Sequence, residues 1–189
     1  MGYEQVAKEL SQIMEEFFVE KGQLFNRVIS RAVECLKTGG KILVFGNGGS
    51  AAQAQHFAAE LVNKFLKERS ALPAISLTTD TSALTSIAND ASFAYVFSRQ
   101  IEALGRKGDL ALGLSTSGDS PNVIEAIKKA KEEDLVTVAL TGKGGGSLRS
   151  LPDFLLDIPS HSTPRIQEGH LILLHLLAQE IEMRMSEQL

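Results

Sequence analysis

The stretch Lys41–Glu60 reads KILVFGNGGSAAQAQHFAAE and predicts a strand, a tight turn and a helix. An apolar run over residues 42–45 stops at a glycine-rich turn, and a helix-type sequence begins at Ser50. Such a junction points free backbone N–H groups and the positive end of a helix dipole above the sheet, which predicts an anion-binding turn. On the same helix, His56 and Glu60 are four residues apart, so both side chains leave one face. This spacing suits a shared metal or a proton-transfer site.

The composition indicates one domain over residues 1–189. The chain is 43% hydrophobic and has a net charge of -4, without a basic run suited to a phosphate backbone. No apolar segment approaches the roughly 20 residues that span a bilayer. We therefore expect neither nucleic acid nor a membrane as a partner. The single Cys35 and the lack of a signal-type N-terminal segment favour a reducing, cytoplasmic setting.

The remaining pattern predicts a doubly wound, five-stranded parallel sheet flanked by helices. Apolar runs without strict polar alternation are typical of strands buried on both faces. A long helix is expected over residues 3–36, continuous or broken near Gly22, and its one-sided apolar face indicates that residues 1–37 are used in oligomerisation. The other expected strands are 73–79, 109–116, 136–142 and 154–159, and the other expected helices are 91–104, 121–133 and 164–185.

A serine-rich turn, LSTSGDSPN over residues 114–122, follows the third expected strand. Hydroxyl groups together with the N–H groups of a helix start can hold a phosphate monoester without Lys or Arg. A plainer alternative makes Ser120 only the N-cap of the helix that Pro121 begins. That alternative does not account for all four hydroxyls at one strand end, those of Ser115, Thr116, Ser117 and Ser120.

Two other features have weaker interpretations. Asn89 and Asp90 either bind sugar hydroxyls or cap a helix beginning at Ala91, and the spacing favours the cap. The glycine turn formally matches the dinucleotide fingerprint, but the first acidic candidate, Asp80, lies 29 residues beyond Ala51 instead of about 20. A nicotinamide-dependent enzyme therefore has little support.

The last helix holds two polar candidates, Gln167 and His175. They are eight residues apart, which places them about 80° from a common face and about 12 Å apart along the axis. They reach one point only if their side chains lean together or come from different subunits. His175 lies in an apolar run, where a single histidine is more often a core residue. His170 and His161 have no partner pattern, and we expect no function for either.

Four segments in this order and spacing resemble the phosphoheptose isomerases of the sugar isomerase (SIS) domain superfamily. The resemblance covers residues 3–185. The segments are GNGGSAAQAQHFAAE, LTTDTSALTSIAND, LSTSGDSPN and PSHSTPRIQEGHLILLH.

The resemblance implies isomerisation of sedoheptulose 7-phosphate to D-glycero-D-manno-heptose 7-phosphate, a step toward the heptose of bacterial surface polysaccharide. It also implies a zinc ion and a homotetramer with active sites between subunits. The residues that it assigns to the substrate are Asn47, Gly48, Gly49, Asn89, Asp90 and Gln167, with Ser115, Thr116, Ser117 and Ser120 on the phosphate. The zinc ligands that it implies are His56, Glu60, Gln167 and His175.

The chemistry of such an isomerase needs a base that moves a proton between C1 and C2 through an enediol. We expect Glu60 to be that base and His175 its proton-transfer partner. A zinc ligand is less free to act as a base, and the sequence leaves this tension open. Gln53 stands where the family usually has Asp, which puts in doubt any hydrogen bond assumed from that carboxylate.

A second hypothesis is a regulatory SIS protein that binds a replication initiator. Such relatives keep the turns but lack the helix glutamate and the last-helix histidine. Because Glu60 and His175 are both present, the enzyme is favoured.

Overall fold

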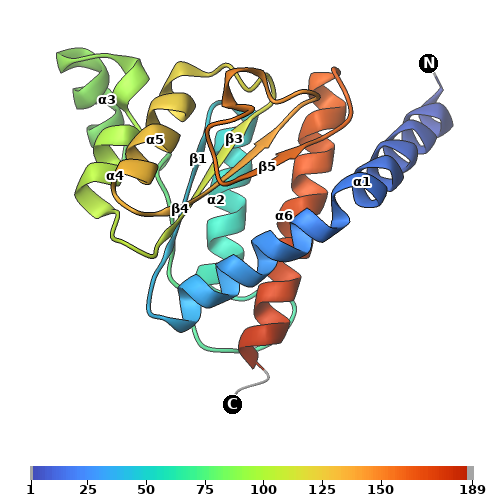
Figure 1. Cartoon of the computed structure of the whole chain (residues 1–189), viewed down its shortest axis with the longest axis horizontal. Coiled ribbons are helices and arrows are strands. Elements are labelled where there is room, and N and C mark those ends of the chain that lie inside the picture. Colours follow the sequence, from blue (N-terminus) through green and yellow to red (C-terminus); the bar gives the residue numbers. More distant parts are fainter. Residues whose placement is uncertain (1, 187–189) are drawn as a thin grey trace.

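The computed structural model describes residues 2–186 as three layers, a sheet between two sets of helices (Figure 1). Within these residues, every helix is too short or too polar to span a lipid bilayer. The strands are β1 (Ile42–Gly46), β2 (Ala74–Ser76), β3 (Leu110–Ser115), β4 (Val136–Thr141) and β5 (Phe154–Asp157). The helices are α1 (Tyr3–Lys37), α2 (Gly49–Val62), α3 (Thr81–Asp90), α4 (Ser98–Leu104), α5 (Pro121–Glu132) and α6 (Thr163–Ser186), with single 3-10 turns η1 (Phe93–Tyr95) and η2 (Gly146–Leu148).

All five strands are parallel, and their order across the sheet is β2-β1-β3-β4-β5. Helices α1, α2 and α6 cover one face, and α3, α4 and α5 lie on the other (Figure 1). This arrangement confirms the predicted doubly wound sheet. From β1 the chain adds β2 on one side and then β3, β4 and β5 on the other, so the strand order reverses between β1 and β3. Sheets of this kind bind their ligands at such a topological switch point.

The strand β1 shows why its sequence has no polar alternation. Ile42 and Val44 pack into the core formed with α1, α2 and α6, whereas Leu43 and Phe45 pack into the core on the opposite face. All four side chains are fully buried. A strand enclosed on both sides is apolar at every position, as the sequence predicted.

The segment between β2 and β3 differs from the prediction. A single helix over residues 91–104 is wrong, because the chain forms α3 before Ala91 and α4 only from Ser98. The Asp80 side chain caps α3 by accepting a hydrogen bond from the backbone N–H of Ala83. The predicted capping role of Asn89 or Asp90 is therefore also wrong, since both end α3.

The long first helix is continuous through Gly22, so the alternative of a break there is wrong. Strand β2 is only three residues long, shorter than the predicted run from Pro73. Backbone pairing nevertheless continues beyond it, because Leu77 N–H donates to the carbonyl of Val44.

His170 is a core residue, as predicted. Its side chain is fully buried, and its Nε2 lies 3.0 Å from the carbonyl oxygen of Thr141. A carbonyl only accepts, so Nε2 carries the proton. Burial lowers the pKa of His170 to about 4, although the bond to Thr141 acts in the opposite direction.

This buried imidazole predicts a pH dependence of stability. The unfolded chain protonates His170 near its ordinary pKa of 6.5, whereas the folded chain resists protonation down to about 4. Stability is thus complete above pH 6.5 and is lost as the pH falls toward 4, by about 2 kcal/mol between pH 7.5 and pH 5. Urea unfolding at both pH values should show this extra loss in the wild type relative to His170→Gln, which keeps a donor for Thr141. Equal losses in the two proteins would contradict the prediction.

Candidate active site

The turns after β1 and β3 lie side by side at the switch point, because Gly46 pairs with Leu114 at the carboxyl ends of these strands. In the first turn, Gly48 has φ 53° and ψ -119°, a conformation that suits glycine. Among the described residues, nothing accepts a hydrogen bond from the backbone N–H of Gly48 or Gly49. These free donors at the start of α2 are the backbone N–H groups that the predicted anion-binding turn requires.

The side chain of Asn47 is engaged within the protein. It exchanges two hydrogen bonds of 2.8 Å with Asn122 at the start of α5. Asn122 is 2% exposed, so this pair is a fixed link between the two turns. Asn122 was not among the predicted site residues, although it ends the serine-rich segment.

The second turn gathers hydroxyl groups as predicted. The Oγ of Ser115 lies 2.9 Å from that of Ser120 and 3.5 Å from that of Ser117, and it accepts from the backbone N–H of Gly118. Ser120 occupies the N-cap position of α5, but its side chain makes no capping bond. Ser120 is thus the N-cap residue by position, as the plainer alternative held, but its hydroxyl bonds to Ser115 instead of capping the helix.

Thr116, the remaining hydroxyl residue of this turn, lines a small polar cavity of about 200 Å³ together with Ser117, Lys143 and His161 among others. The neighbouring glycine loop, residues 142–147, is bonded to this turn. Asp119 accepts two hydrogen bonds from Ser147, which hold the pKa of Asp119 below its usual range. The serine turn and this loop thus form one bonded unit.

The acid and base groups meet between α2 and α6. His56 Nε2 lies 2.9 Å from His175 Nε2 and 3.0 Å from Glu60 Oε1, and His175 Nε2 lies 3.5 Å from the same carboxylate oxygen. The Glu60 side chain is 12% exposed, against 49% for His56 and 38% for His175. Burial raises the pKa of Glu60, and the two imidazoles offset part of this rise. His175 is therefore not a core residue, and a single chain supplies all three groups.

These three side chains fit a metal ion. Their ligand atoms all lie within 4.8 Å of one another. The three separations of 2.9, 3.0 and 3.5 Å bracket the roughly 3.3 Å edge of a tetrahedron of zinc ligands. In addition, Glu60 Oε2 is buried without a hydrogen-bond partner among the described residues. Two imidazoles and one carboxylate are a common donor set for zinc, and they leave a fourth position for another ligand.

Gln167 is not joined to this cluster. Its amide lies beside the first turn, where its Nε2 is 2.6 Å from the place that a Cβ on Gly49 would occupy. Among the described residues, no hydrogen bond links it to His56, Glu60 or His175. Its backbone carbonyl accepts from Gln53 Nε2 at 2.7 Å, while Gln53 Oε1 is buried with no hydrogen-bond partner within residues 2–186. Gln53 therefore bonds to the backbone of α6 and not to the histidines.

Asn89 and Asp90 also lie apart. They are exposed at the end of α3, and their described side-chain hydrogen bond is the one that joins them to each other. Their part of the chain lies on the face opposite α2 and α6 (Figure 1).

Comparison with known proteins shows what the chain is related to. A family model described as the SIS domain matches residues 5–142. The phosphoheptose isomerase of Desulfovibrio desulfuricans is 54% identical over 173 residues, covering 92% of this chain and 82% of that protein. The phosphoheptose isomerase of Campylobacter jejuni subsp. jejuni is 54% identical over 175 residues, covering 93% of this chain and 94% of that protein.

A solved structure, phosphoheptose isomerase GmhA from Neisseria gonorrhoeae, matches with a TM-score of 0.87 and 45% sequence identity. The match covers 95% of this chain and 97% of that one. Sequence and fold thus agree over nearly the full length of both chains, and this chain belongs to the phosphoheptose isomerases of the SIS-domain family.

Proposed function

We propose that this chain is an aldose–ketose isomerase that converts sedoheptulose 7-phosphate to D-glycero-D-manno-heptose 7-phosphate for heptose biosynthesis. The observation that carries the proposal is a largely buried carboxylate, Glu60, flanked by two imidazoles. The names of the relatives favour the enzyme over the alternative of a regulator that binds a replication initiator.

The proton chemistry is assigned to Glu60 and His175. The carboxylate of Glu60 takes a proton from C1 of the ketose, which gives an enediol, and returns it to C2 to give the aldose. His175 moves the hydroxyl proton between the two oxygens, so that no proton is gained or lost overall. A pKa raised by burial makes Glu60 a stronger base than an exposed glutamate.

The substrate phosphate is assigned to the hydroxyls of Ser115, Thr116, Ser117 and Ser120. The polyol is assigned to Asn47, Gly48, Gly49, Asn89, Asp90 and Gln167. Free backbone N–H groups in the first turn support the roles of Gly48 and Gly49, and clustered hydroxyls in the second turn support those of Ser115, Ser117 and Ser120.

A zinc ion is assigned to His56, Glu60, Gln167 and His175. Bound there, it would polarise the carbonyl and hydroxyl oxygens of the sugar. His56, Glu60 and His175 already converge. Gln167 completes the set either from a neighbouring subunit or after its amide moves away from Gly49.

The assembly that we infer is a homotetramer with active sites between subunits, formed from a single domain over residues 1–189. Glu60 lies 11 residues beyond Gly49 on α2, a rise of about 16 Å. An extended seven-carbon phosphate reaches only about 10 Å from C1 to phosphorus, at about 1.2 Å per bond. The backbone positions of the first turn and Glu60 are thus further apart along α2 than C1 and phosphorus are in the substrate, which favours a site completed by a second chain.

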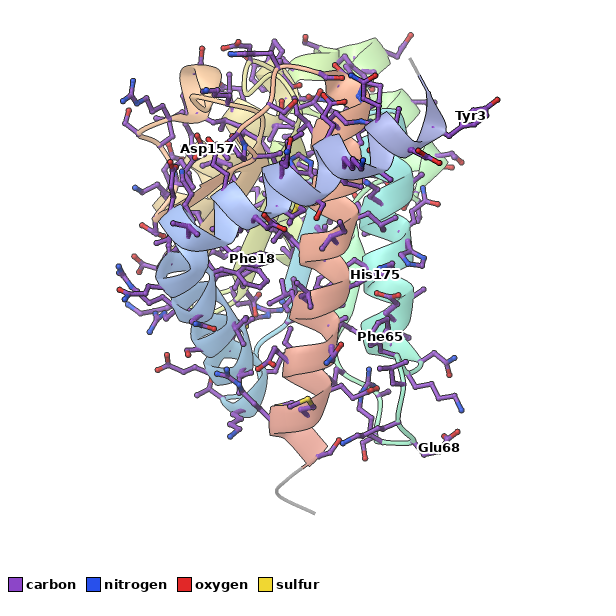
Figure 2. All side chains as sticks on the ribbon, turned by 90° about the vertical axis from the view of Figure 1, so that its right-hand side faces the viewer. Tyr3, Phe18, Phe65, Glu68, Asp157 and His175 are labelled. Carbon is purple, nitrogen blue, oxygen red and sulfur yellow. The ribbon has the colours of Figure 1, made fainter. Side chains whose placement is uncertain are left out.

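The first helix supplies a surface for such contacts. Tyr3 is 95% exposed and Val19 is 87% exposed, and Phe18 also reaches solvent (Figure 2). A broad apolar hollow of about 780 Å³ lies beside them along α1. Exposed apolar area of this kind marks interaction surfaces. The partners that we propose are thus the sugar phosphate and copies of this chain, without nucleic acid or membrane, in the reducing cytoplasm.

One assay tests the function. In D₂O, purified protein supplied with zinc should consume sedoheptulose 7-phosphate, and the aldose product should appear in proton NMR spectra with solvent deuterium at C2. Exchange of the abstracted proton is expected for an enediol route. A protein that leaves the ketose untouched and instead captures an initiator protein would support the regulatory alternative.

The phosphate assignment predicts the effect of Ser120→Ala. Loss of a hydroxyl that bonds a charged phosphate should raise the KM for the sugar phosphate about 10-fold, with kcat little changed. Asp80→Ala is the matched control, because Asp80 does cap its helix: it should cost about 1 kcal/mol of stability and leave KM unchanged. An unchanged KM in Ser120→Ala would remove Ser120 from the phosphate site.

A further inference from the structure

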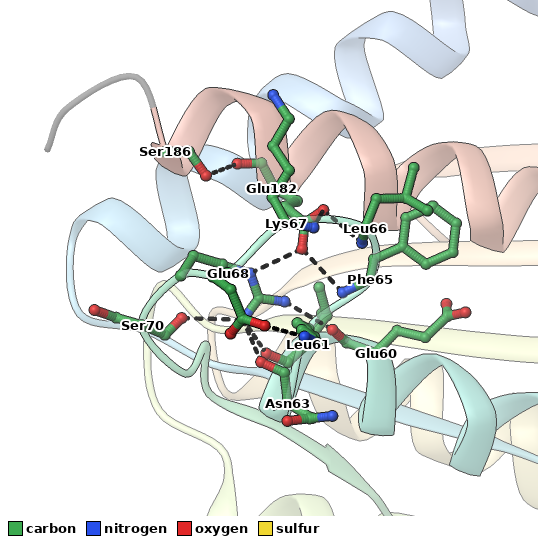
Figure 3. Close-up of polar contacts among 12 residues, drawn as sticks. Glu60, Leu61, Asn63, Phe65, Leu66, Lys67, Glu68, Ser70, Glu182 and Ser186 are labelled. Atoms are coloured by element: carbon green, nitrogen blue, oxygen red, sulfur yellow. Dashed lines mark hydrogen bonds and ion pairs between the residues drawn. The ribbon is translucent and has the colours of Figure 1, made fainter.

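One buried carboxylate on α6 organises the connection between α2 and β2. Glu182 accepts hydrogen bonds from three successive backbone N–H groups, those of Phe65, Leu66 and Lys67, at 2.8–2.9 Å (Figure 3). Glu182 is 1% exposed. Burial alone would raise the pKa of Glu182, but these donors and Arg69 hold it below its usual range. The segment 65–67 thus has its backbone fixed to α6.

Arg69 joins the same connection to the end of α2. Its guanidinium lies 3.4 Å from Glu182, and both side chains are 2% exposed. It donates to the carbonyl oxygens of Leu61, Asn63 and Ser70, and also to the carbonyl of Glu60 at 2.7 Å. The last carbonyls of a helix have no partner within the helix, so Arg69 supplies one. The backbone of the proposed base is therefore bonded directly to Arg69.

These bonds fix the backbone of residues 65–67 so that Phe65 lies against His175, the proposed proton-transfer residue. The rings of Phe65 and His175 are stacked, with centroids 5.7 Å apart and planes 28° apart. Figure 2 shows both side chains beside α6. The His175 ring also contacts His56 edge-on, and its Nε2 lies 3.5 Å from Glu60 Oε1.

This stack matters because the other described polar contacts of the His175 ring, those with His56 and Glu60, are both made at Nε2. A histidine ring turns broadly about its last side-chain bond, and imidazoles in such sites are usually oriented by a hydrogen bond on the second ring nitrogen. Among the described residues, no group bonds Nδ1 of His175. The flat contact with Phe65 is therefore the feature that sets the ring plane.

We propose that Arg69 and Glu182 are positioning residues of the isomerase, which hold Phe65 flat against His175 and fix the backbone of Glu60. The inference rests on the roles proposed above for Glu60 and His175. Neither Arg69 nor Glu182 touches the substrate, and both act through the groups that do.

Glu182→Gln tests the proposal, because it keeps the shape of the side chain but turns an NH₂ group toward backbone donors. We expect kcat per folded molecule to fall about 10- to 100-fold, the usual cost of losing such support. The KM for the sugar phosphate should stay near the wild-type value, since the serine turn lies on other elements.

Asp109→Asn is the matched control. Asp109 is a second buried carboxylate that accepts from two backbone N–H groups, those of Lys41 and Arg106, and from the Lys41 ammonium. Its partners belong to connections other than the one between α2 and β2, so this variant should lose stability and keep its kcat. Circular dichroism at the assay temperature gives the folded fraction of each protein. Equal losses of kcat per folded molecule in the two variants would overturn the proposal.

Phe65→Leu covers the case in which Glu182→Gln does not fold. Leucine keeps an apolar side chain but removes the flat ring, so kcat should fall while KM is retained. Full kcat in Phe65→Leu would overturn the proposal, provided that Glu60→Gln is inactive. If Glu60→Gln is itself active, the proposed site fails, and that outcome is distinct from a failure of the positioning residues.

Discussion

Glu60→Gln should lower kcat at least about 100-fold, and toward 10⁴-fold, because the amide cannot take the proton from C1. The substitution keeps the size of the side chain and leaves both turns at the switch point unchanged. Binding of sedoheptulose 7-phosphate, measured by calorimetry, should therefore persist. Single-turnover assays and binding isotherms on the same preparation separate the two effects.

The pH dependence of the wild-type enzyme provides a second test of Glu60 as the base. Because burial raises the pKa of Glu60, its basic form is lost as the pH falls through a value above that of an exposed glutamate. The acidic limb of kcat/KM should accordingly lie at a higher pH than an ordinary carboxylate gives.

A control distinguishes loss of the base from a general disturbance. Glu180→Gln removes a glutamate of α6 that pairs with Arg184 near the molecular surface, away from the proposed base on α2, and it should leave kcat and KM unchanged. The zinc content of each variant, measured by mass spectrometry, shows whether Glu60→Gln also removes the metal. Near-normal turnover in Glu60→Gln would refute the assignment of the base.

Local sequence rules predicted most of the fold because the sheet is buried on both faces. Each strand is a short apolar run, and the five observed strands lie within or beside the predicted ones. Helix α3 was missed because none of its residues is fully buried and its apolar positions are few, so its helical period is weak. Ser120 shows the opposite failure. A local rule places Ser120 at the N-cap and suggests a capping bond, but its hydroxyl bonds to Ser115 on β3 instead.

The candidate site was predictable where its members share one helix. His56 and Glu60 are one turn apart, so their spacing alone predicted a common face. His175 was weighed as a core residue because its partners lie on another helix, which no spacing reveals. Arg69 and Glu182 are more than a hundred residues apart in sequence. The only local hint was that Glu182 follows His175 by seven residues, which places both on one side of α6.

Gly118→Ala should be the most damaging single methyl group in the proposed phosphate site. Gly118 has φ 75°, and a Cβ there would lie 2.1 Å from the carbonyl oxygen and 2.4 Å from the carbonyl carbon of Gly145. Both are backbone atoms, so no side-chain rotation relieves the contact. The expected cost is the left-handed backbone penalty of about 1–2 kcal/mol plus overpacking of about 1–3 kcal/mol.

Gly108→Ala measures the first of these costs, the backbone penalty, on its own. Gly108 has φ 88°, but nothing lies within 4 Å of a Cβ built on it. It should therefore lose only the backbone penalty, and the difference between the two variants in urea unfolding measures the steric contact alone.

The KM for the sugar phosphate should differ between the two variants more than their free energies of unfolding do. Gly118 donates its N–H to the hydroxyl of Ser115, and its carbonyl accepts from Leu148 in the glycine loop. An added methyl group must push the serine turn and this loop apart, which disperses the hydroxyls that the phosphate needs. The KM for the sugar phosphate should rise at least 10-fold in Gly118→Ala and stay unchanged in Gly108→Ala. Equal KM values would mean that the turn accommodates the methyl group, and that the close approach of Gly118 to Gly145 does not shape the phosphate site.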